Sequence, residues 1–304
     1  MGLARIHSTL VVAALAAGGL LAGTLAPLPA SAAGTPNILT TPTKVAHTSL
    51  GSVGYREIGH GPTLVMITGF GAGMDDWAPT LIDDLAAHFK VVVFDNAGVG
   101  KTSRLPKTLT VPGMAAQTSA LITKLKLGRV DVLGWSMGGM IAQSLAVGHP
   151  TQVHKLVLAA TQAGTGKAAP VPVAARDALD SGSAVAVVKL LFPSNQVPAL
   201  LSYAAGVRSY PNFYSASARV RGEQQTAVDH WLEGDDSTGR DIAKLKTTTL
   251  VADGAEDAID PSSNDRMLAS LIHRSKLVLY PDAGHGFLFQ DAGAFVTELR
   301  KVLG

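Results

Sequence analysis

One serine in this sequence has the surroundings of a catalytic nucleophile. Ser136 is the centre of Gly134-Trp135-Ser136-Met137-Gly138, a G-x-S-x-G pattern that follows an apolar run and opens a helical one. A chain that turns sharply from strand to helix has no space for side chains two positions either side of the serine. The hydroxyl would stand at a helix N-terminus, where backbone N–H groups favour an oxyanion. The alternative is an ordinary N-cap serine in a glycine-rich turn.

Among the nine histidines, His285 has the best position to activate this serine. It follows the apolar run 276–280 closely, and loops at the carboxyl ends of parallel strands meet at one edge of a sheet. A serine nucleophile needs a base that accepts its proton. The alternative for His285 is a turn residue without chemistry, but together with Ser136 the sequence favours the catalytic base.

An acid that orients the histidine is expected in the turn 254–261, which follows another apolar run. We assign this role to Asp257. The carboxylates that remain as alternatives are Glu256, Asp260 and Asp253. The resulting chain order is Ser136, Asp257, His285, which is the serine–acid–histidine order that accompanies a nucleophile at a strand-to-helix elbow.

The loop 68–77, TGFGAGMDDW, has the composition of an oxyanion site. Its glycines let the backbone approach a ligand closely; they are Gly69, Gly71 and Gly73. We expect the N–H groups of Phe70 and Met137 to bind the oxyanion, because two such donors hold the charge of a tetrahedral intermediate. Gly69 and Trp135, beside these donors, are the expected substrate contacts. A flexible connection without chemistry is the alternative.

The elements that must position these residues alternate between strand and helix. Apolar runs predict strands at 62–70, 90–95, 129–135, 154–161, 247–254 and 276–280, and helical spacing predicts helices at 75–89, 111–127, 137–150 and 292–303. Two short edge strands joined by a turn are expected within 44–59. Continuous apolar strands that alternate with helices predict an α/β fold, a mostly parallel sheet flanked by helices.

This alternation defines the expected domain organisation. Residues 45–160 and 237–304 form the two parts of the core. Between them, 161–236 contains helical patches broken by proline and glycine and no buried strand, so we expect a helical cap over the strand ends. Residues 33–44 read as a linker, and 1–32 as a signal peptide.

The leader has the three parts of an export signal. A short polar start precedes the apolar run 10–25, and Ala30-x-Ala32 supplies the small residues of a cleavage site. Cleavage after Ala32 or after Ala33 would release a secreted protein, with retention at the cell envelope as a variant of this outcome. An uncleaved membrane anchor is the alternative, and it is the only reading that predicts a membrane association.

Composition and one deceptive motif limit the partners. The sequence has no cysteine, which excludes disulfides and thiolate metal sites, and its net charge of +2 without a basic block gives no indication of nucleic-acid binding. Gly100-Lys101-Thr102 resembles the end of a nucleotide-binding P-loop. The position where a P-loop has its first glycine is Asp95, and Pro106 prevents the helix that should follow. We therefore expect no nucleotide.

Together these motifs resemble the α/β-hydrolase superfamily over almost the whole chain after the leader. The matching stretches are the oxyanion loop TGFGAGMDDW, the glycine turn FDNAGVGKTS, the nucleophile elbow GWSMGG and the acid and base in GAED…GH. The resemblance implies the α/β-hydrolase fold with Ser–Asp–His chemistry. Two departures stand out: Thr68 occupies the position of the family's loop-bracing histidine, and Ala97 replaces an arginine common in the glycine turn.

The sequence thus predicts a serine hydrolase that cleaves a small carboxylic ester through an acyl-enzyme, with no metal or organic cofactor. Relatives imply alternatives on the same triad: a cofactor-free peroxidase or perhydrolase, and a carbon–carbon bond hydrolase. Amide and lactone hydrolysis are further variants. A catalytically inactive binding module is the alternative from a different class. Substrate identity, acyl chain length and oligomeric state have no signature in the sequence.

Overall fold

A single sheet forms the middle layer of the computed structural model, which describes residues 37–181 and 183–304. Its eight strands have the order β1-β2-β4-β3-β5-β6-β7-β8. β2 is antiparallel to both of its neighbours, and all the remaining pairs are parallel. The strands are β1 Lys44–Thr48, β2 Gly51–Ile58, β3 Thr63–Ile67, β4 Lys90–Phe94, β5 Val130–Trp135, β6 Val153–Ala159, β7 Thr248–Gly254 and β8 Ser275–Tyr280.

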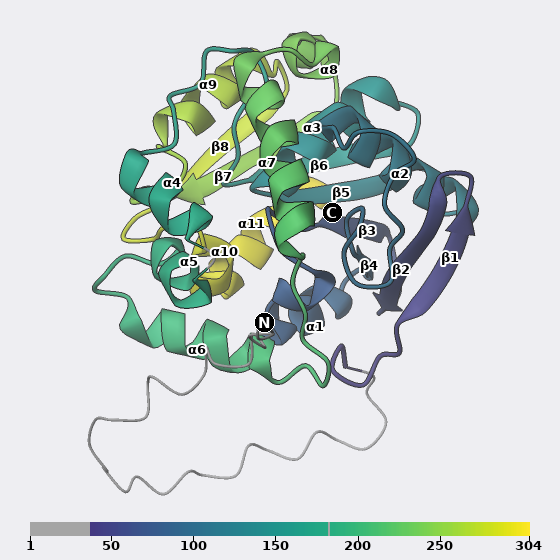
Figure 1. Cartoon of the computed structure of the whole chain (residues 1–304), viewed down its shortest axis with the longest axis horizontal. Helices are drawn as coiled ribbons and strands as arrows, with labels where there is room; N and C mark the ends of the chain where they lie inside the picture. Colours follow the sequence, from purple (N-terminus) through teal and green to yellow (C-terminus); the bar gives the residue numbers. More distant parts are fainter. Residues whose placement is uncertain (1–36, 182) are drawn as a thin grey trace, which may run out of the picture.

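Helices cover both faces of this sheet (Figure 1). The helices are η2 Met74–Asp76, α1 Pro79–Ala86, α2 Val111–Lys124, α3 Met137–Gly148, α4 Val173–Asp180, α5 Ala184–Leu191, α6 Val197–Arg208, α7 Ala218–Glu233, α8 Ser237–Arg240, η3 Asp241–Lys244, α9 Ser263–Leu271, α10 Phe287–Gln290 and α11 Ala292–Leu303. The expected α/β architecture, a mostly parallel sheet flanked by helices, is therefore confirmed.

Alternation along the strands divides the interior into two apolar layers. Leu64 and Met66 of β3 pack with α1 and α11, whereas Val65 and Ile67 pack with α2, α3 and α9. All four side chains are fully buried. A strand that is buried on both faces reads as a continuous apolar run, which explains why the central strands were recognisable in the sequence.

The segment between β6 and β7 is helical. Figure 1 shows α4, α5 and α6 on one flank and α7 crossing in front of the sheet. α7 begins where the Ser217 hydroxyl accepts the Val220 N–H, and it ends at Gly234, whose φ of 80° is readily adopted by glycine. We call the helical segment 161–236 the cap. Four of its large apolar side chains are exposed, namely Val173, Val197, Leu201 and Phe213.

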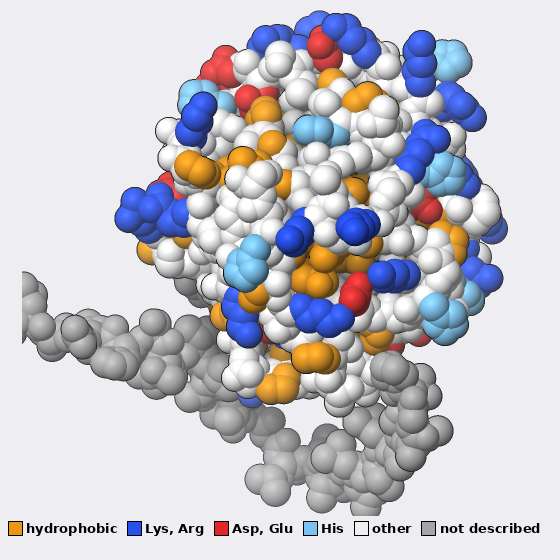
Figure 2. Space-filling model, turned by 90° about the vertical axis from the view of Figure 1, so that its right-hand side faces the viewer, with side chains coloured by type: hydrophobic (Ala, Val, Ile, Leu, Met, Phe, Trp, Pro, Cys, Tyr) orange, Lys and Arg blue, Asp and Glu red, His pale blue; other side chains and the backbone are white. Residues whose placement is uncertain are grey.

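The surface combines charged and apolar side chains. On the face seen in Figure 2, hydrophobic side chains gather near the centre, and Lys and Arg side chains surround them. Within the described residues, no helix is long and apolar enough to cross a membrane. The expected signal peptide and the first four residues of the expected linker, 33–36, lie outside the described residues.

Some local expectations differ from the structure. The helix expected over 75–89 is interrupted at Trp77 and Ala78, so that η2 ends at Asp76 and α1 covers only Pro79–Ala86; a proline is favoured at the first position of a helix and not in its interior. β2 is not an edge strand, because it pairs with β4 as well as with β1, so β1 alone occupies that edge. The helix expected over 111–127 ends at Lys124, since Lys126 adopts a φ of 53° before the expected stop at Gly128. A residue with left-handed backbone conformation ends a helix. In this structure that residue is Lys126, two positions before Gly128.

Candidate active site

Ser136 lies on the sharp turn between β5 and α3. Its backbone has φ 57° and ψ −126°, a strained conformation for a residue with a side chain. The surrounding glycines are required by contact: a Cβ on Gly134 would lie 2.2 Å from the Gly138 carbonyl oxygen, and one on Gly138 would lie 2.1 Å from that of Ile67. The elbow expected from the G-x-S-x-G pattern is therefore present, and it projects the serine from the end of the strand.

The turn after β7 brings Asp257 to the histidine. Its Oδ2 lies 2.6 Å from His285 Nδ1, and both side chains are buried. Its Oδ1 accepts the N–H groups of Ile259 at 2.6 Å and Asp260 at 2.9 Å, which fixes the carboxylate. Because Nδ1 is engaged, Nε2 is the nitrogen available for a reacting group.

The other carboxylates considered from the sequence have different surroundings. Glu256 is exposed. The carboxyl of Asp260 accepts a hydrogen bond from Asn264 at 2.7 Å, and that of Asp253 accepts the Gly254 N–H at 2.7 Å. Among the four candidates in this turn and strand end, the structure brings Asp257 to the imidazole.

Two cavities share part of their lining. Ser136, Phe70 and His285 line both of them. The larger has a volume of about 240 Å³ and is walled mainly by apolar side chains of α5 and α6 and by Trp135. The smaller has a volume of about 60 Å³ and is bounded by residues of α3, α4 and α7. The serine and the histidine thus share a space that a ligand can enter from two sides.

The expected oxyanion donors, Phe70 and Met137, lie in the same part of the structure as Ser136. Phe70 and Met137 flank the smaller cavity together with Ser136. Within the described part of the chain, neither of their N–H groups is used by a protein acceptor. A Cβ on Gly69 would lie 3.1 Å from that of Ser136, so the loop backbone packs directly against the serine. An N–H that is free beside a nucleophile is what an oxyanion site requires.

Trp135 serves the histidine as well as the cavity. Its Nε1 donates a hydrogen bond of 3.0 Å to the His285 carbonyl, and the two rings lie 5.6 Å apart. It also lines the larger cavity, where it was expected to contact substrate. One side chain therefore connects the end of β5, next to Ser136, to the loop that contains His285.

Asn96 braces the loop where the sequence departs from the family. Its Nδ2 donates to the Thr68 carbonyl at 3.1 Å and to the Thr68 hydroxyl at 3.3 Å. Asn96 follows β4 and is almost completely buried. The bracing function of the missing histidine is therefore available from a neighbouring strand end.

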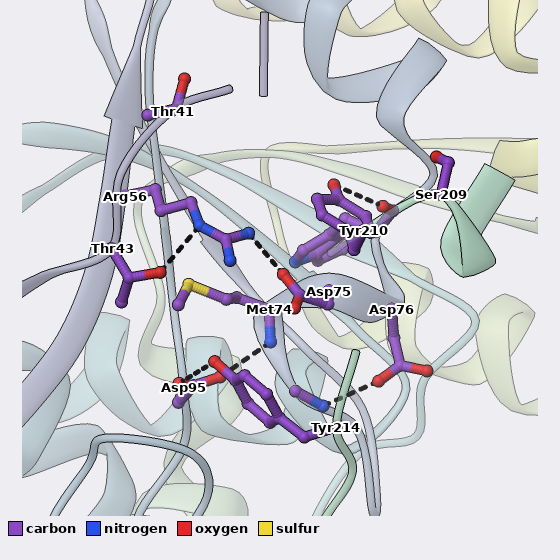
Figure 3. Close-up of polar contacts among 12 residues, drawn as sticks. Thr41, Thr43, Arg56, Met74, Asp75, Asp76, Asp95, Ser209, Tyr210 and Tyr214 are labelled. Atoms are coloured by element: carbon purple, nitrogen blue, oxygen red, sulfur yellow. Dashed lines mark hydrogen bonds and ion pairs between the residues drawn. The ribbon is translucent and has the colours of Figure 1, made fainter. Parts of the chain in front are cut away.

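A buried polar network supports the rest of this loop (Figure 3). Arg56 of β2 forms an ion pair with Asp75 inside the protein. Asp95 accepts the Met74 N–H at 2.9 Å and the Tyr214 hydroxyl at 2.6 Å. Burial raises the pKa of Asp95 to about 6. The network fixes the loop from the sheet side and from the cap side at once.

The cap holds the same loop through side chains that the sequence analysis did not identify. Gln224 of α7 accepts the Gly71 N–H at 2.8 Å, and the Ala216 N–H donates to the Gly71 carbonyl at 2.9 Å. Tyr203 and Tyr210 donate hydrogen bonds to two backbone carbonyls of the loop, those of Asp76 and Trp77. No local pattern signals such contacts, because each partner is more than a hundred residues away in the sequence.

Three further aspartates form a buried cluster behind Asp257. Carboxylate oxygens of Asp253, Asp260 and Asp265 lie within 4.8 Å of one another, close enough to ligate a cation. Without a cation, three buried carboxyl groups at this spacing are stable only if they hold protons. Burial raises the pKa of Asp265 to about 7, and burial together with neighbouring carboxylates raises the pKa of Asp253 and Asp260 well above the usual range. An exposed group, His230, Glu233 and Asp235, has similar spacing.

Comparison with known proteins agrees with the fold. Residues 62–292 match the family model described as the alpha/beta hydrolase fold. The chain is 30% identical over 253 residues to a poly(3-hydroxyalkanoate) depolymerase of Ectopseudomonas oleovorans, covering 80% of this chain and 85% of that protein. It is 27% identical over 265 residues to a 2-hydroxy-6-oxo-2,4-heptadienoate hydrolase of Pseudomonas putida, covering 82% and 91%. An alpha/beta hydrolase fold protein from Chitinophaga pinensis superposes with a TM-score of 0.71 at 26% identity, covering 87% and 98%.

Proposed function

The chain belongs to the α/β-hydrolase fold family, and we propose that it is a serine hydrolase that cleaves carboxylic esters through an acyl-enzyme. The observation that carries this proposal is the contact between His285 Nδ1 and Asp257 Oδ2, at 2.6 Å, in a site that also holds the strained Ser136. Two hydrolase relatives, one of them named for depolymerising a hydroxyalkanoate polyester, support hydrolytic chemistry.

Acylation uses each of these groups once. The Ser136 hydroxyl attacks the ester carbonyl carbon while its proton passes to His285 Nε2. Asp257 orients the imidazole and stabilises the positive charge that forms on it. The N–H groups of Phe70 and Met137 hold the oxyanion of the tetrahedral intermediate. The carbon–oxygen bond to the alcohol then breaks, and the alcohol leaves with the proton from His285.

Deacylation follows the same steps, with water in place of the serine hydroxyl as the nucleophile. His285 accepts a proton from water, whose oxygen attacks the acyl carbon, and the bond to Ser136 breaks as the serine recovers a proton. The products are a carboxylic acid and the free enzyme. The two cavities that meet at Ser136 provide separate spaces for the acyl and the alcohol parts, and their apolar walls favour aliphatic groups.

A panel of nitrophenyl esters with increasing acyl length tests this function. We expect hydrolysis by the wild type, and a loss of at least about 10³-fold in kcat for Ser136→Ala and for His285→Ala. Asp257→Asn should also lose activity, whereas its matched control, Glu256→Gln in the same turn, should retain it. Full activity in both the serine and the histidine variants would overturn the proposal.

The dienoate-hydrolase relative makes carbon–carbon bond hydrolysis the second candidate. A comparison of substrates distinguishes the two candidates. If the enzyme hydrolyses a ring-cleavage dienoate and none of the esters, the triad catalyses carbon–carbon bond hydrolysis. Formation of peracid from acetate and peroxide would identify a perhydrolase. Failure of a fluorophosphonate probe to label Ser136 would instead indicate a binding module.

A further inference from the structure

One carboxyl group lines the larger cavity together with the nucleophile. Asp76, at the end of the short helix η2, is half-buried and borders this cavity, as do Ser136 and Trp135. The walls around it are mainly apolar and come from α5, α6 and the segment that follows. In a pocket of this kind, a few well-placed polar groups determine the orientation and the identity of the ligand.

Only one oxygen of this carboxyl has a structural task. Its Oδ2 accepts the Gly73 N–H at 2.8 Å, which closes the turn of the oxyanion loop. Figure 3 shows the other oxygen directed away from this contact. Among the described residues, no group donates a hydrogen bond to that second oxygen and no salt bridge reaches it. It is therefore available to a ligand in the cavity.

The nearby charges do not neutralise Asp76. Arg56 is paired with Asp75. Arg221 of α7 lines the same cavity, but its guanidinium donates a hydrogen bond to the Ala216 carbonyl and forms no ion pair with Asp76 in the described residues. Burial raises the pKa of Asp76 to about 7, and the carboxylates of Asp75 and Asp95 act in the same direction. A group that titrates near neutral pH in a cavity beside a nucleophile has the character of a functional residue.

We propose that Asp76 is a substrate-recognition residue, and that the larger cavity takes esters carrying a hydrogen-bond donor, a hydroxyl or an ammonium group, on the part that occupies it. This inference rests on the proposed ester hydrolysis and names its substrate class. The second carboxyl oxygen receives the donor, while the apolar walls hold the intervening carbon chain. A substrate that ends in a methyl group would leave this oxygen without a partner.

The test compares esters that differ only at the chain end. In one series the nitrophenyl acyl chain is hexanoate, its terminal hydroxyl analogue or its terminal amine analogue. In the other, butyrate is esterified with butanol or with the corresponding terminal hydroxyl or amine alcohol, because either part of the ester could occupy the cavity. We expect the wild type to prefer the donor-bearing member of at least one series by about tenfold in kcat/KM.

The variant Asp76→Asn separates recognition from loop structure. The amide oxygen of the variant can still accept the Gly73 N–H, but the substitution removes the negative charge and the second acceptor oxygen. We expect the preference for the donor-bearing ester to fall by about five- to tenfold. Asp84→Asn, which neutralises an exposed aspartate of α1, is the matched control and should keep the wild-type ratio.

The outcomes distinguish this inference from the function on which it rests. A preference for the amine that disappears in Asp76→Asn supports recognition of a cation, and one for the hydroxyl supports recognition of a neutral donor. Equal use of all chain ends by the wild type, or an unchanged ratio in Asp76→Asn, overturns the subsite while ester hydrolysis stands. Hydrolysis that survives Ser136→Ala overturns the proposed function instead.

Discussion

Four aspartates lie close to the histidine, and their surroundings give them different roles. Asp257 meets the imidazole and two backbone N–H groups. Asp265 lies behind it in the buried cluster, and neither of its oxygens accepts a hydrogen bond from a non-carboxyl donor in the described residues. The ionised form of such a side chain is poorly solvated, so folding should depend on its proton.

This arrangement predicts a pH dependence of stability. Burial raises the pKa of Asp265 from 3.8 to about 7, so the folded state retains a proton that the unfolded chain has released. Its contribution to stability is complete below about pH 4 and is lost as pH rises through 7. Asp265→Asn keeps a neutral group and should remove this loss. We expect the wild-type Tm to fall about 5 °C more than that of the variant between about pH 5 and about pH 8.

Thermal unfolding followed by circular dichroism at each pH measures the difference. Asp84→Asn removes an exposed aspartate and should leave the wild-type slope unchanged. Parallel Tm curves for the wild type and Asp265→Asn would contradict a proton held by Asp265.

In the sequence, Ser136 and His285 have distinctive local patterns, whereas the choice among the acids depends on the three-dimensional geometry. Asp257 and Glu256 are adjacent and chemically equivalent in the sequence. They differ because the turn after β7 directs one inward and exposes the other. Asp76 escaped notice for the same reason, since nothing in DDW indicates that one of its aspartates pairs with an arginine and the other faces a cavity.

At the scale of elements, α7 and the segment before it hold the loop 68–77 through hydrogen bonds to Gly71. Gln224 accepts the N–H of Gly71 and the segment before α7 donates to its carbonyl, so both polar groups of this residue are held by the cap. Gly71 directly follows Phe70, whose N–H is a proposed oxyanion donor. A displacement of this backbone should therefore affect the transition state more than the binding of substrate.

Gln224→Met removes the acceptor and preserves a chain of similar length. We expect kcat for ester hydrolysis to fall roughly 10- to 100-fold with little change in KM, because the loop loses its position and the cavity keeps its walls. Gln224→Glu retains an acceptor oxygen and should recover most of kcat. Thr226→Ala, on the exposed side of the same helix, is the control. A rise in KM at constant kcat would assign Gln224 to substrate binding instead.

At the scale of the whole molecule, the cap is continuous with the core. Tyr203, Val207 and Tyr210 belong to the apolar cluster on the α1 and α11 face, and Ala227 and Trp231 belong to the cluster on the opposite face. The alternation of strands and helices made the parallel part of the sheet predictable, because the strands from β3 onward are largely apolar runs. The path of the cap was not predictable, since its contacts join residues that are distant in sequence and have no regular spacing.

This continuity predicts that cap and core unfold together. The three tryptophans allow a direct test: Trp77 and Trp135 lie in the core, Trp231 lies in the cap, and all are buried. In the double variant Trp77→Phe and Trp135→Phe, fluorescence reports on the cap alone, while far-ultraviolet circular dichroism reports on the whole chain. We expect the two urea transitions to share a midpoint, because the cap helices bury their apolar sides in the same clusters as the sheet.

Wild-type circular dichroism is the control for the destabilisation that the substitutions cause. A fluorescence transition at distinctly lower urea would show that the cap opens as a separate unit, and the oxyanion loop held by Gln224 would then be ordered only while the cap is closed.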